Sequence, residues 1–480
     1  MKLLILVLLV LCSSTTTAFS LRNPLNSPTS KKDPTPVQYS VGILEGINEI
    51  SRDGWNNLLP ADVPDDCCSP FLQHDWLNCL EKSQCASQKK GWQALHILVY
   101  KEPDDKVTPT TPIPKTEDDI VAALPMYVKY HSQGEFIFDH SWADFAERVL
   151  KIRYYPKLLS AIPFTPATTP KILLNPKHLP DSTDDKQAKE ALSKQLGTLI
   201  ATFIKQLTLQ NKLSSVNLNY IKADEVTILQ ESDFSLRQTI QYRFTNFNNA
   251  TGEMFDSFDD YLSQFKSKRR IKIKAERRKV YEDQMLTVRV INGADPEADA
   301  AFYQTMFELY STTIEKMWGS QYLNSEFFQC LHEAPEEFRR NLVFIVAFDE
   351  NILDKPIAGT FNMISGSHFY GRYWGAFEYK DNLHFEVCYY KAIDFCIDNR
   401  IRFMEPGAGG GSFKFLRGFD PYIVNSMHWF SSNELGTAVD DFLAQERKIN
   451  QDTKEVLMDM SQGKKALRSS DSSVFEDTTS

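Results

Sequence analysis

A glycine-rich stretch near the C-terminal end is the first candidate for chemistry. Residues 403–414 read FMEPGAGGGSFK, with four glycines in five residues directly after an apolar run. Phosphate-binding loops need GxxxxGK[ST], or GxGxxG opening a helix, whereas here the lysine follows the last glycine by three residues and no hydroxyl residue comes next. The stretch is therefore an ordinary turn or a loop that lines a site. In the second case the candidate binding residues are Glu405, Gly407, Gly409, Gly410, Lys414 and Arg417.

Glu386 is the candidate catalytic acid or base. It lies in the segment LHFEVCYYKAIDFCIDN (383–399), which predicts a helix that is apolar over most of its surface. The other polar side chains of that helix form one stripe, and Glu386 lies well away from it. A carboxylate on an apolar face is costly to bury unless it is paired or used.

Two interpretations of Glu386 are open. In the structural one, the carboxylate is stabilised by the helix dipole or by an arginine such as Arg372. In the functional one, Glu386 positions or deprotonates an acceptor amine, with Tyr370 or Tyr373 nearby on the preceding strand. Arg372 is also a candidate substrate-binding residue in this second interpretation.

A strongly basic run is the third candidate. From Lys266 to Lys279 the chain has nine basic residues against one acid, Glu276, in a protein with a net charge of −10. This pattern is typical of a solvated helix face, or of an anion site for a nucleotide-linked substrate or an RNA. Few aromatic residues interrupt it, so base stacking is not indicated. The candidate anion-binding residues are Lys268, Arg269, Arg270, Arg277 and Arg278.

The composition describes a globular protein. With 480 residues, 42% hydrophobic and 12% aromatic, the chain is long enough for two or three domains. Its acidic balance argues against a general nucleic-acid binder. No group of His and Cys has zinc spacing, so no metal is expected. We also expect no membrane span once the N-terminal segment is removed.

The N-terminal segment predicts a targeting sequence. In residues 1–18 one lysine precedes LLILVLLVLC and small residues follow, as in a secretory signal peptide. Residues 19–36 begin FSLRNPLNSPTSKK, a basic stretch rich in Ser and Pro that is typical of a transit-like linker. Together they resemble the bipartite plastid presequence of algae with secondary plastids, which implies delivery to the plastid stroma. Simple secretion is the alternative.

The cysteines favour reduced thiols. Seven remain beyond Cys12, an odd number without the density of a secreted disulfide scaffold. Reduced thiols fit a stroma better than the outside of a cell. The seven are Cys67, Cys68, Cys79, Cys85, Cys330, Cys388 and Cys396.

Two blocks of the chain share one predicted order of elements, β-β-β-α-β. The first has strands at 94–100, 121–130, 135–140 and 214–220 and a helix at 186–212. The second has strands at 341–348, 356–364, 368–377 and 401–405 and a helix at 383–399. This order resembles the core of the N-acetyltransferase (GNAT) fold. We therefore expect an α/β (α+β) protein with two GNAT-like domains side by side.

The expected boundaries follow from the linkers between these blocks. The first domain is predicted at 37–235, the second at 236–450 with a basic helix at 257–283, and a disordered tail at 451–480. The turn HSQGEF (131–136) combines His131 and Glu135, and we expect it near a cleft between the domains. An ordinary polar hairpin turn is the alternative.

Several long segments occur together in one order: SPFLQHDWLNCLE (69–81), LPMYVKYHSQGEFIFDHSWADF (124–145), KMWGSQYLNSEFF (316–328) and FLRGFDPY (415–422). On these the chain, from residue 40 to residue 447, resembles the FemAB-like proteins of the peptidoglycan biosynthesis/recognition group. The resemblance implies two GNAT-like domains and transfer of an acyl or aminoacyl group to an amine on a peptidoglycan-like or amino-sugar peptide. It also implies acyl-CoA or aminoacyl-tRNA as donor, no tightly bound cofactor, and a tRNA contact through 266–279.

The chain departs from the pattern of its relatives in two places. The turn GAFEYKDNLHFE (375–386), where acetyl-CoA-dependent GNAT enzymes hold a pyrophosphate, is acidic and has one glycine. The glycine stretch has Gly409, Gly411 and Phe413 where related loops carry a Gln and an acid–His pair. Because that stretch follows the fifth strand of a GNAT-like sheet, we interpret it as a cleft-lining loop in which Lys414 and Arg417 contact an anion. A non-catalytic glycan- or peptide-binding protein and an RNA-contacting protein are the alternatives.

Overall fold

The computed structural model describes most of the chain between residues 37 and 460. The predicted signal peptide and linker lie almost entirely outside the described residues, as do Gly410, Cys67, Cys68 and residues 461–480 of the predicted tail. The described residues are 17–19, 37–60, 69–102, 115–180, 186–316, 321–351, 355–409 and 411–460.

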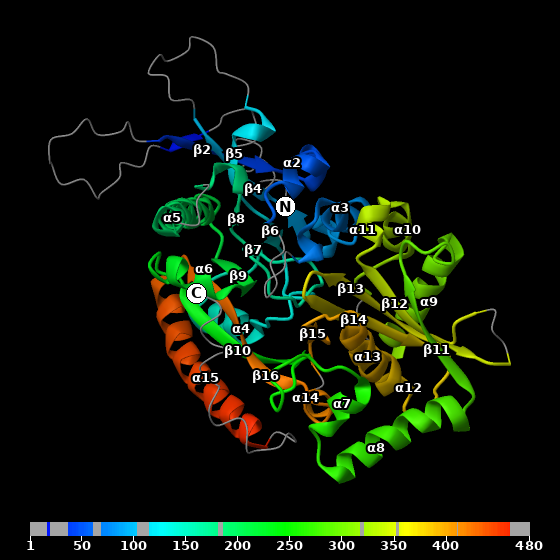
Figure 1. The fold of residues 1–480 in the computed structure, drawn as a ribbon. Helices are drawn as coiled ribbons and strands as arrows, with labels where there is room; N and C mark the ends of the chain where they lie inside the picture. The colour runs from blue at the N-terminus through cyan, green and yellow to red at the C-terminus, as the bar shows by residue number, and fades with distance from the viewer. Residues whose placement is uncertain are drawn as a thin grey trace.

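One sheet of eleven strands runs through the molecule (Figure 1). In spatial order its strands are β11 (Leu286–Asn292), β12 (Leu342–Asp349), β13 (Ala358–Ser365), β14 (His368–Ala376), β15 (Phe403–Glu405), β10 (Ser235–Thr245), β16 (Asp420–Phe430), β9 (Ser215–Ile221), β7 (Lys157–Ser160), β6 (Tyr127–Lys129) and β3 (Trp92–Ala94). A second sheet contains β1 (Thr17–Phe19), β2 (Tyr39–Leu44), β4 (His96–Lys101), β5 (Ile120–Leu124) and β8 (Leu173–Leu174).

The helices cover both sheets. Those of the first unit are α2 (Arg52–Asn56), α3 (His74–Lys82), α4 (His140–Phe145), α5 (Lys186–Gln210) and α6 (Ala223–Gln230). Those of the second unit are α7 (Phe258–Ser263), α8 (Ser267–Arg278), α9 (Ala300–Lys316), α10 (Ser325–Glu333), α11 (Glu336–Arg339), α12 (Leu383–Phe385), α13 (Lys391–Asp398), α14 (Gly411–Phe415) and α15 (Asn433–Met460). Two π-helical turns extend this second set, η7 (Lys279–Asp283) after α8 and η8 (Glu386–Tyr390) between α12 and α13.

The two units repeat one topology, which confirms the predicted mixed α/β fold with two GNAT-like units. In the second unit β11 to β14 pair antiparallel, and β15 pairs parallel with β14 after the helical segment from α12 to α13. In the first unit β6 and β7 pair antiparallel, and β9 pairs parallel with β7 after α5. In each unit the parallel pair is thus the one that a helix connects.

In the β-β-β-α-β order of the first unit, the third strand is β7. The prediction of a strand at 135–140 is therefore wrong. That segment is an irregular loop that ends at Asp139, the residue before α4. Phe136 has a φ of +58°, which a strand does not accommodate. Glu135 and Asp139 both turn inward to the Lys157 ammonium group, and this buried charge cluster outweighs the alternating pattern of the segment.

The sequence pattern does not predict that the two units share a sheet. β10 pairs with β16 over residues 235–243, and its next residues, Phe244 and Thr245, pair with β15. β16 in turn pairs with β9 of the first unit. The strands β10 and β16 therefore join the units.

Two predicted segments also differ from the structure. The helix predicted at 257–283 is divided into α7, α8 and η7. Residues 451–460, predicted as part of a disordered tail, are the last turns of α15. This helix lies along β10 and β16 (Figure 1), where Asn450 Nδ2 donates to the Gln238 carbonyl at 2.8 Å.

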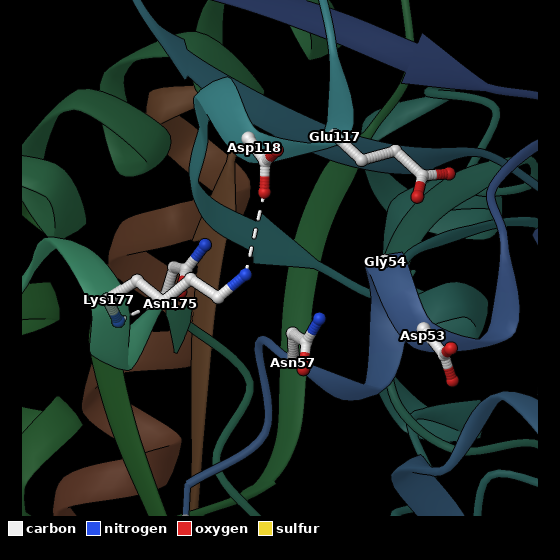
Figure 2. Close-up of a pocket in the computed structure, with 7 residues that line it drawn as sticks. All are labelled: Asp53, Gly54, Asn57, Glu117, Asp118, Asn175 and Lys177. Carbon is white, nitrogen blue, oxygen red and sulfur yellow. Dashed lines mark hydrogen bonds and ion pairs between the residues drawn. The ribbon is translucent and has the colours of Figure 1, made fainter.

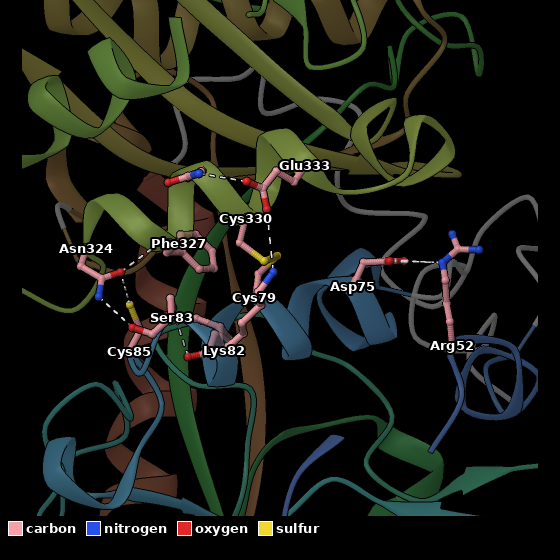
Figure 3. The surroundings of a disulfide bond; sticks show 12 residues. Arg52, Asp75, Cys79, Lys82, Ser83, Cys85, Asn324, Phe327, Cys330 and Glu333 are labelled. Carbon is pink, nitrogen blue, oxygen red and sulfur yellow. Dashed lines mark hydrogen bonds and ion pairs between the residues drawn. A yellow bond between two sulfur atoms is a disulfide. The ribbon is translucent and has the colours of Figure 1, made fainter. Parts of the chain in front are cut away.

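A disulfide joins the first unit to the second. It links Cys79 of α3 to Cys330 of α10, whose Cα atoms are 5.5 Å apart (Figure 3). Beside it, Asn324 Nδ2 donates to the Ser83 carbonyl at 2.8 Å, and Cys85 Sγ donates to Asn324 Oδ1 at 3.2 Å. The prediction of reduced thiols is therefore wrong for this pair, because 251 residues separate two cysteines that only the fold brings together.

Reduction of this disulfide is expected to lower the free energy of unfolding by about 2–4 kcal/mol, because the cross-link restricts the unfolded chain. Urea denaturation with and without dithiothreitol measures the difference. The variant Cys79→Ala/Cys330→Ala is the control, since its stability must not depend on reductant. Equal stability of the unmodified protein under both conditions would contradict a structural role.

Candidate active site

The strands β14 and β15 stop pairing at Tyr370 and Glu405, a point that we call the strand fork. Beyond it β14 continues, while the chain after Glu405 turns away at Pro406 and Gly407. Gly407 has a φ of +82°, a conformation that favours glycine. A Cβ atom on Gly371 would lie 3.3 Å from the Pro406 Cα, so a side chain at Gly371 would crowd the fork.

Five polar side chains gather at the strand fork, and we call them the fork cluster: Tyr220 of β9, Gln241 of β10, Arg372 of β14, Glu405 of β15 and Tyr422 of β16. Gln241 Nε2 donates to the Tyr220 hydroxyl oxygen at 3.2 Å, and the Tyr422 hydroxyl donates to Gln241 Oε1 at 3.4 Å. Since β9 belongs to the first unit and β14 and β15 to the second, both units build this cluster.

Arg372 is held rigidly at the fork. Its Nη1 donates to the Gly371 carbonyl at 3.0 Å, and its guanidinium carbon lies 4.5 Å from the Phe71 ring centroid and 5.5 Å from that of Tyr370. Its Nε and Nη2 are buried without a hydrogen-bond partner among the described residues. Burial lowers the pKa of Arg372, and the Glu405 carboxylate opposes that change.

Glu405 combines burial with an unused acceptor. Its side chain is 4% exposed, and its Oε2 has no hydrogen-bond partner among the described residues. Burial raises the pKa of the Glu405 carboxyl, while Arg243, Arg372 and the nearby Tyr422 hydroxyl oppose the rise. A buried carboxylate with a raised pKa is a stronger base than an exposed one and can accept a proton from a bound amine.

The glycine stretch leads from the fork into α14. Gly407 and Gly409 both have positive φ, +82° and +77°, and the Lys414 ammonium group donates to the Gly407 carbonyl. Burial, and then the charge of Arg372, lower the pKa of Lys414 to about 8. Arg417 is already engaged, because its Nη2 lies 3.0 Å from Glu276 Oε2. The structure thus places Lys414 beside the fork and assigns Arg417 to an ion pair.

Glu386 lies away from the fork cluster, in a paired position on η8. Arg277 Nη2 and Nε lie 3.0 and 3.1 Å from its two carboxylate oxygens, and the Tyr281 hydroxyl donates to it at 2.8 Å. Burial raises the pKa of the Glu386 carboxyl, against the effects of Arg277 and Tyr281. The structural interpretation named an arginine such as Arg372, but the partner is Arg277 of the basic helix.

The two tyrosines expected beside Glu386 face the opposite side of the sheet. Tyr370 and Tyr373 pack in the core that contains Phe361, whereas Phe369 of the same strand packs in the core beneath Glu386. The Tyr373 hydroxyl donates to the Phe164 carbonyl at 3.1 Å. A register shift between Phe361 and Asn362 gives β14 one extra residue at Arg372, so Tyr370 and Tyr373 lie on the same face of the sheet. The proposed trio of Glu386, Tyr370 and Tyr373 therefore does not form.

The turn 131–136 touches the fork cluster through its backbone. The Tyr220 hydroxyl donates to the Phe136 carbonyl at 3.1 Å. His131 instead accepts from the Lys129 ammonium group, 3.2 Å from its Nδ1, and Glu135 Oε2 lies 2.7 Å from Lys157 Nζ. The turn thus lies beside the site, but neither His131 nor Glu135 belongs to the fork cluster.

The basic run forms α8 at one edge of the molecule (Figure 1). Lys268 and Arg278 are exposed, and Arg269 and Arg270 are half-buried. Arg270 donates to the Phe265 carbonyl at 2.6 Å. Arg277 forms ion pairs with Glu386 and with Asp394, whose Oδ2 lies 3.3 Å from Arg277 Nη2. A cavity of about 480 Å³ beside this helix is lined by Ser257, Phe258, Asp259, Leu262, Lys274, Arg277, Arg278, Tyr281 and Glu282.

A second cavity, of about 270 Å³, lies in the first unit (Figure 2). Three of its charged groups have partners within the protein, since Glu117 accepts from the Ser51 backbone amide at 2.7 Å and Lys177 lies 3.5 Å from Asp118. None of the fork-cluster residues lines it, so we assign it no part in the site. Its lining residues are Asp53, Gly54, Asn57, Glu117, Asp118, Asn175 and Lys177.

Among the described residues, no group of three or more His, Cys, Asp or Glu side chains could hold a metal ion. None of the helices described here combines the length and apolarity needed to cross a membrane.

Three members of the fork cluster were not predicted from the sequence: Tyr220, Gln241 and Tyr422. Tyr220 lies in a predicted strand (214–220), whereas no strand was predicted over β10 or β16. The polar groups converge through pairings of β9, β10 and β16. One signal was available, since Tyr422 ends FLRGFDPY directly after the glycine stretch.

One family model matches most of the chain. Residues 46–464 match the family model FemAB_like, described as peptidoglycan biosynthesis/recognition. A search of curated proteins found no match. Among solved structures, FemX is 12% identical, with 83% of this chain and 100% of that chain covered and a TM-score of 0.41. A tandem GNAT protein from the clavulanic acid biosynthesis pathway is 7% identical, with 82% and 99% covered and a TM-score of 0.36. L-PGS from Bacillus licheniformis is 8% identical, with 74% and 90% covered and a TM-score of 0.39.

Proposed function

Because this chain belongs to the FemAB-like family, we propose that it is an acyl- or aminoacyl-transferase that forms an amide on the amine of a peptidoglycan-like acceptor. The observation that carries the proposal is Glu405, a buried carboxylate at the strand fork with an unused oxygen. An attacking amine must lose a proton, and a carboxylate with a raised pKa is suited to take it.

The reaction that this geometry supports needs no covalent intermediate on the protein. The acceptor amine attacks the carbonyl carbon of the donor ester or thioester, Glu405 accepts a proton from the amine, and the leaving oxygen or sulfur takes up a proton as the bond to the carbonyl breaks. The Tyr422 hydroxyl lies beside Glu405 and donates to Gln241 Oε1, so this part of the cluster is ordered before substrate binds.

An aminoacyl ester is the donor we favour over an acyl-CoA. The turn before α12 carries Glu378 and Asp381, and an acidic turn is a poor host for a pyrophosphate. The exposed basic side chains of α8 would supply contacts to RNA phosphates.

The proposal is tested by incubating the purified protein with an amino-sugar peptide and either labelled aminoacyl-tRNA or acyl-CoA. Mass spectrometry then detects the new amide. Amide formation with one donor supports the transferase and identifies the donor class. Binding of the peptide without transfer from either donor favours the alternative, a non-catalytic glycan- or peptide-binding protein.

Neutralising α8 is expected to weaken binding of aminoacyl-tRNA. The triple variant Lys268→Gln/Arg269→Gln/Arg278→Gln removes three charges from the helix, and the slope of log K against log salt should fall by about 2–3. Filter binding at several salt concentrations measures that slope. The matched control removes three lysines of α5, Lys186, Lys189 and Lys194, and should leave it unchanged. Equal slopes for the two triple variants would exclude α8 as the RNA contact.

A further inference from the structure

Arg372 presents one edge of its guanidinium that nothing in the described protein uses. Nη1 is bonded to the Gly371 carbonyl, and the rings of Phe71 and Tyr370 lie against the group. The remaining edge, formed by Nε and Nη2, is buried and has no hydrogen-bond partner among the described residues. This is the edge through which arginine donates two parallel hydrogen bonds to a carboxylate or phosphate.

The charge of Arg372 also lacks a close counter-ion. Among the described residues, no carboxylate oxygen forms an ion pair with its guanidinium, and Glu405 acts on it only from a greater distance. Lys414 adds a second positive charge nearby, and its pKa is lowered in part by Arg372. Burial of guanidinium donors without a hydrogen-bond partner or a counter-ion is unfavourable, so packing alone does not explain an arginine at this position.

We propose that the Nε–Nη2 edge of Arg372 binds an oxyanion of the substrate, a carboxylate or a phosphate, at the strand fork. The bound anion satisfies two buried donors and supplies the missing negative charge. It also places the substrate within the fork cluster, next to the free oxygen of Glu405.

This inference rests on the proposed function in one respect, namely that the bound anion is part of a substrate. Binding of an oxyanion by Arg372 does not itself depend on turnover. Amide formation alone does not require an acidic group on the substrate. The proposed oxyanion site does require one, close to the reacting centre. Both donor atoms are inaccessible to solvent in this structure, so an entering anion must displace a neighbouring side chain.

The first test observes the arginine directly, without any reaction. The full-length protein is labelled with ¹⁵N-arginine, the Nε–H signal of Arg372 is assigned with Arg372→Lys, and acetate or inorganic phosphate is added. The signal should shift and saturate with one of these anions, and chloride at the same ionic strength should not move it. A response to acetate assigns a carboxylate and a response to phosphate assigns a phosphate. No shift beyond that seen with chloride overturns the proposal.

The second test measures KM for the transferase reaction, once the donor and the acceptor are known. Arg372→Gln should raise KM for one substrate about 10- to 100-fold, because two charge-assisted hydrogen bonds are lost. Arg372→Lys keeps the charge but not the two parallel N–H donors, and should recover only part of the affinity. Arg148→Gln, at a residue whose side chain is 79% exposed, is the matched control. Absence of turnover in the unmodified protein would contradict the proposed function, whereas the NMR result would still decide whether Arg372 binds an oxyanion.

Discussion

Replacement of Glu405 by glutamine is expected to lower turnover by about 10²- to 10³-fold with little change in melting temperature. Glutamine keeps the size of the side chain and one acceptor oxygen, but it cannot take a proton from the acceptor amine. Burial of an amide at this position costs less than burial of a charge. Single-turnover kinetics with saturating donor measures the effect on the chemical step.

The matched control for this variant is Glu386→Gln. Both residues are buried glutamates of the second unit, but Glu386 is paired with Arg277 and lies away from the fork cluster. Activity per folded molecule should therefore persist in Glu386→Gln. The assignment of Glu405 fails if Glu405→Gln turns over normally, or if the two variants lose activity equally.

The same assignment predicts a pH profile. Only the ionised form of Glu405 can accept a proton, and burial raises the pKa of this carboxyl above its ordinary value. The rate constant kcat/KM should thus increase as the pH rises through that raised pKa, and this acidic limb should disappear in Glu405→Gln. The rate rises with pH because the ionised form is the active one, and the raised pKa moves this limb to higher pH than for an exposed glutamate.

The fold was predictable where local pattern and topology agree. In the second unit, strand alternation and the apolar helix at 383–399 correspond to β12, β13, β14, β15 and the segment from α12 to α13. In the first unit the prediction failed at 135–140, because the carboxylates of Glu135 and Asp139 turn inward to a lysine of β7. No local pattern contains that long-range charge pairing.

The candidate site was predictable only in part, for a related reason. Arg372, Glu405 and Lys414 were candidates because polar residues beside an apolar strand and a glycine stretch stand out in the sequence. Tyr220 and Gln241 join them through strand pairings between units, which no spacing along the chain reports. Glu386 was recognised as a costly carboxylate, but its partner Arg277 lies 109 residues earlier.

Removal of either member of the Arg277–Glu386 pair is expected to cost about 3–5 kcal/mol in the free energy of unfolding. The Glu386 side chain is fully buried and that of Arg277 is 20% exposed. Glu386→Met leaves a largely buried guanidinium with only Asp394 beside it, and Arg277→Met leaves a buried carboxylate with only the Tyr281 hydroxyl. Urea denaturation of each variant measures the loss.

The double variant Arg277→Met/Glu386→Met decides whether the pair acts as a unit. Two apolar side chains of similar length satisfy the site without a buried charge, so the double variant should be more stable than either single one. The exposed pair Arg340–Glu336, whose side chains are 67% and 60% exposed, provides the comparison, and its removal should cost no more than about 1 kcal/mol. If the two single losses simply add, the two side chains act independently. If Glu386→Met instead remains fully stable but inactive, Glu386 is a catalytic residue. The role of Arg277 and helix α8 is then to position its carboxylate.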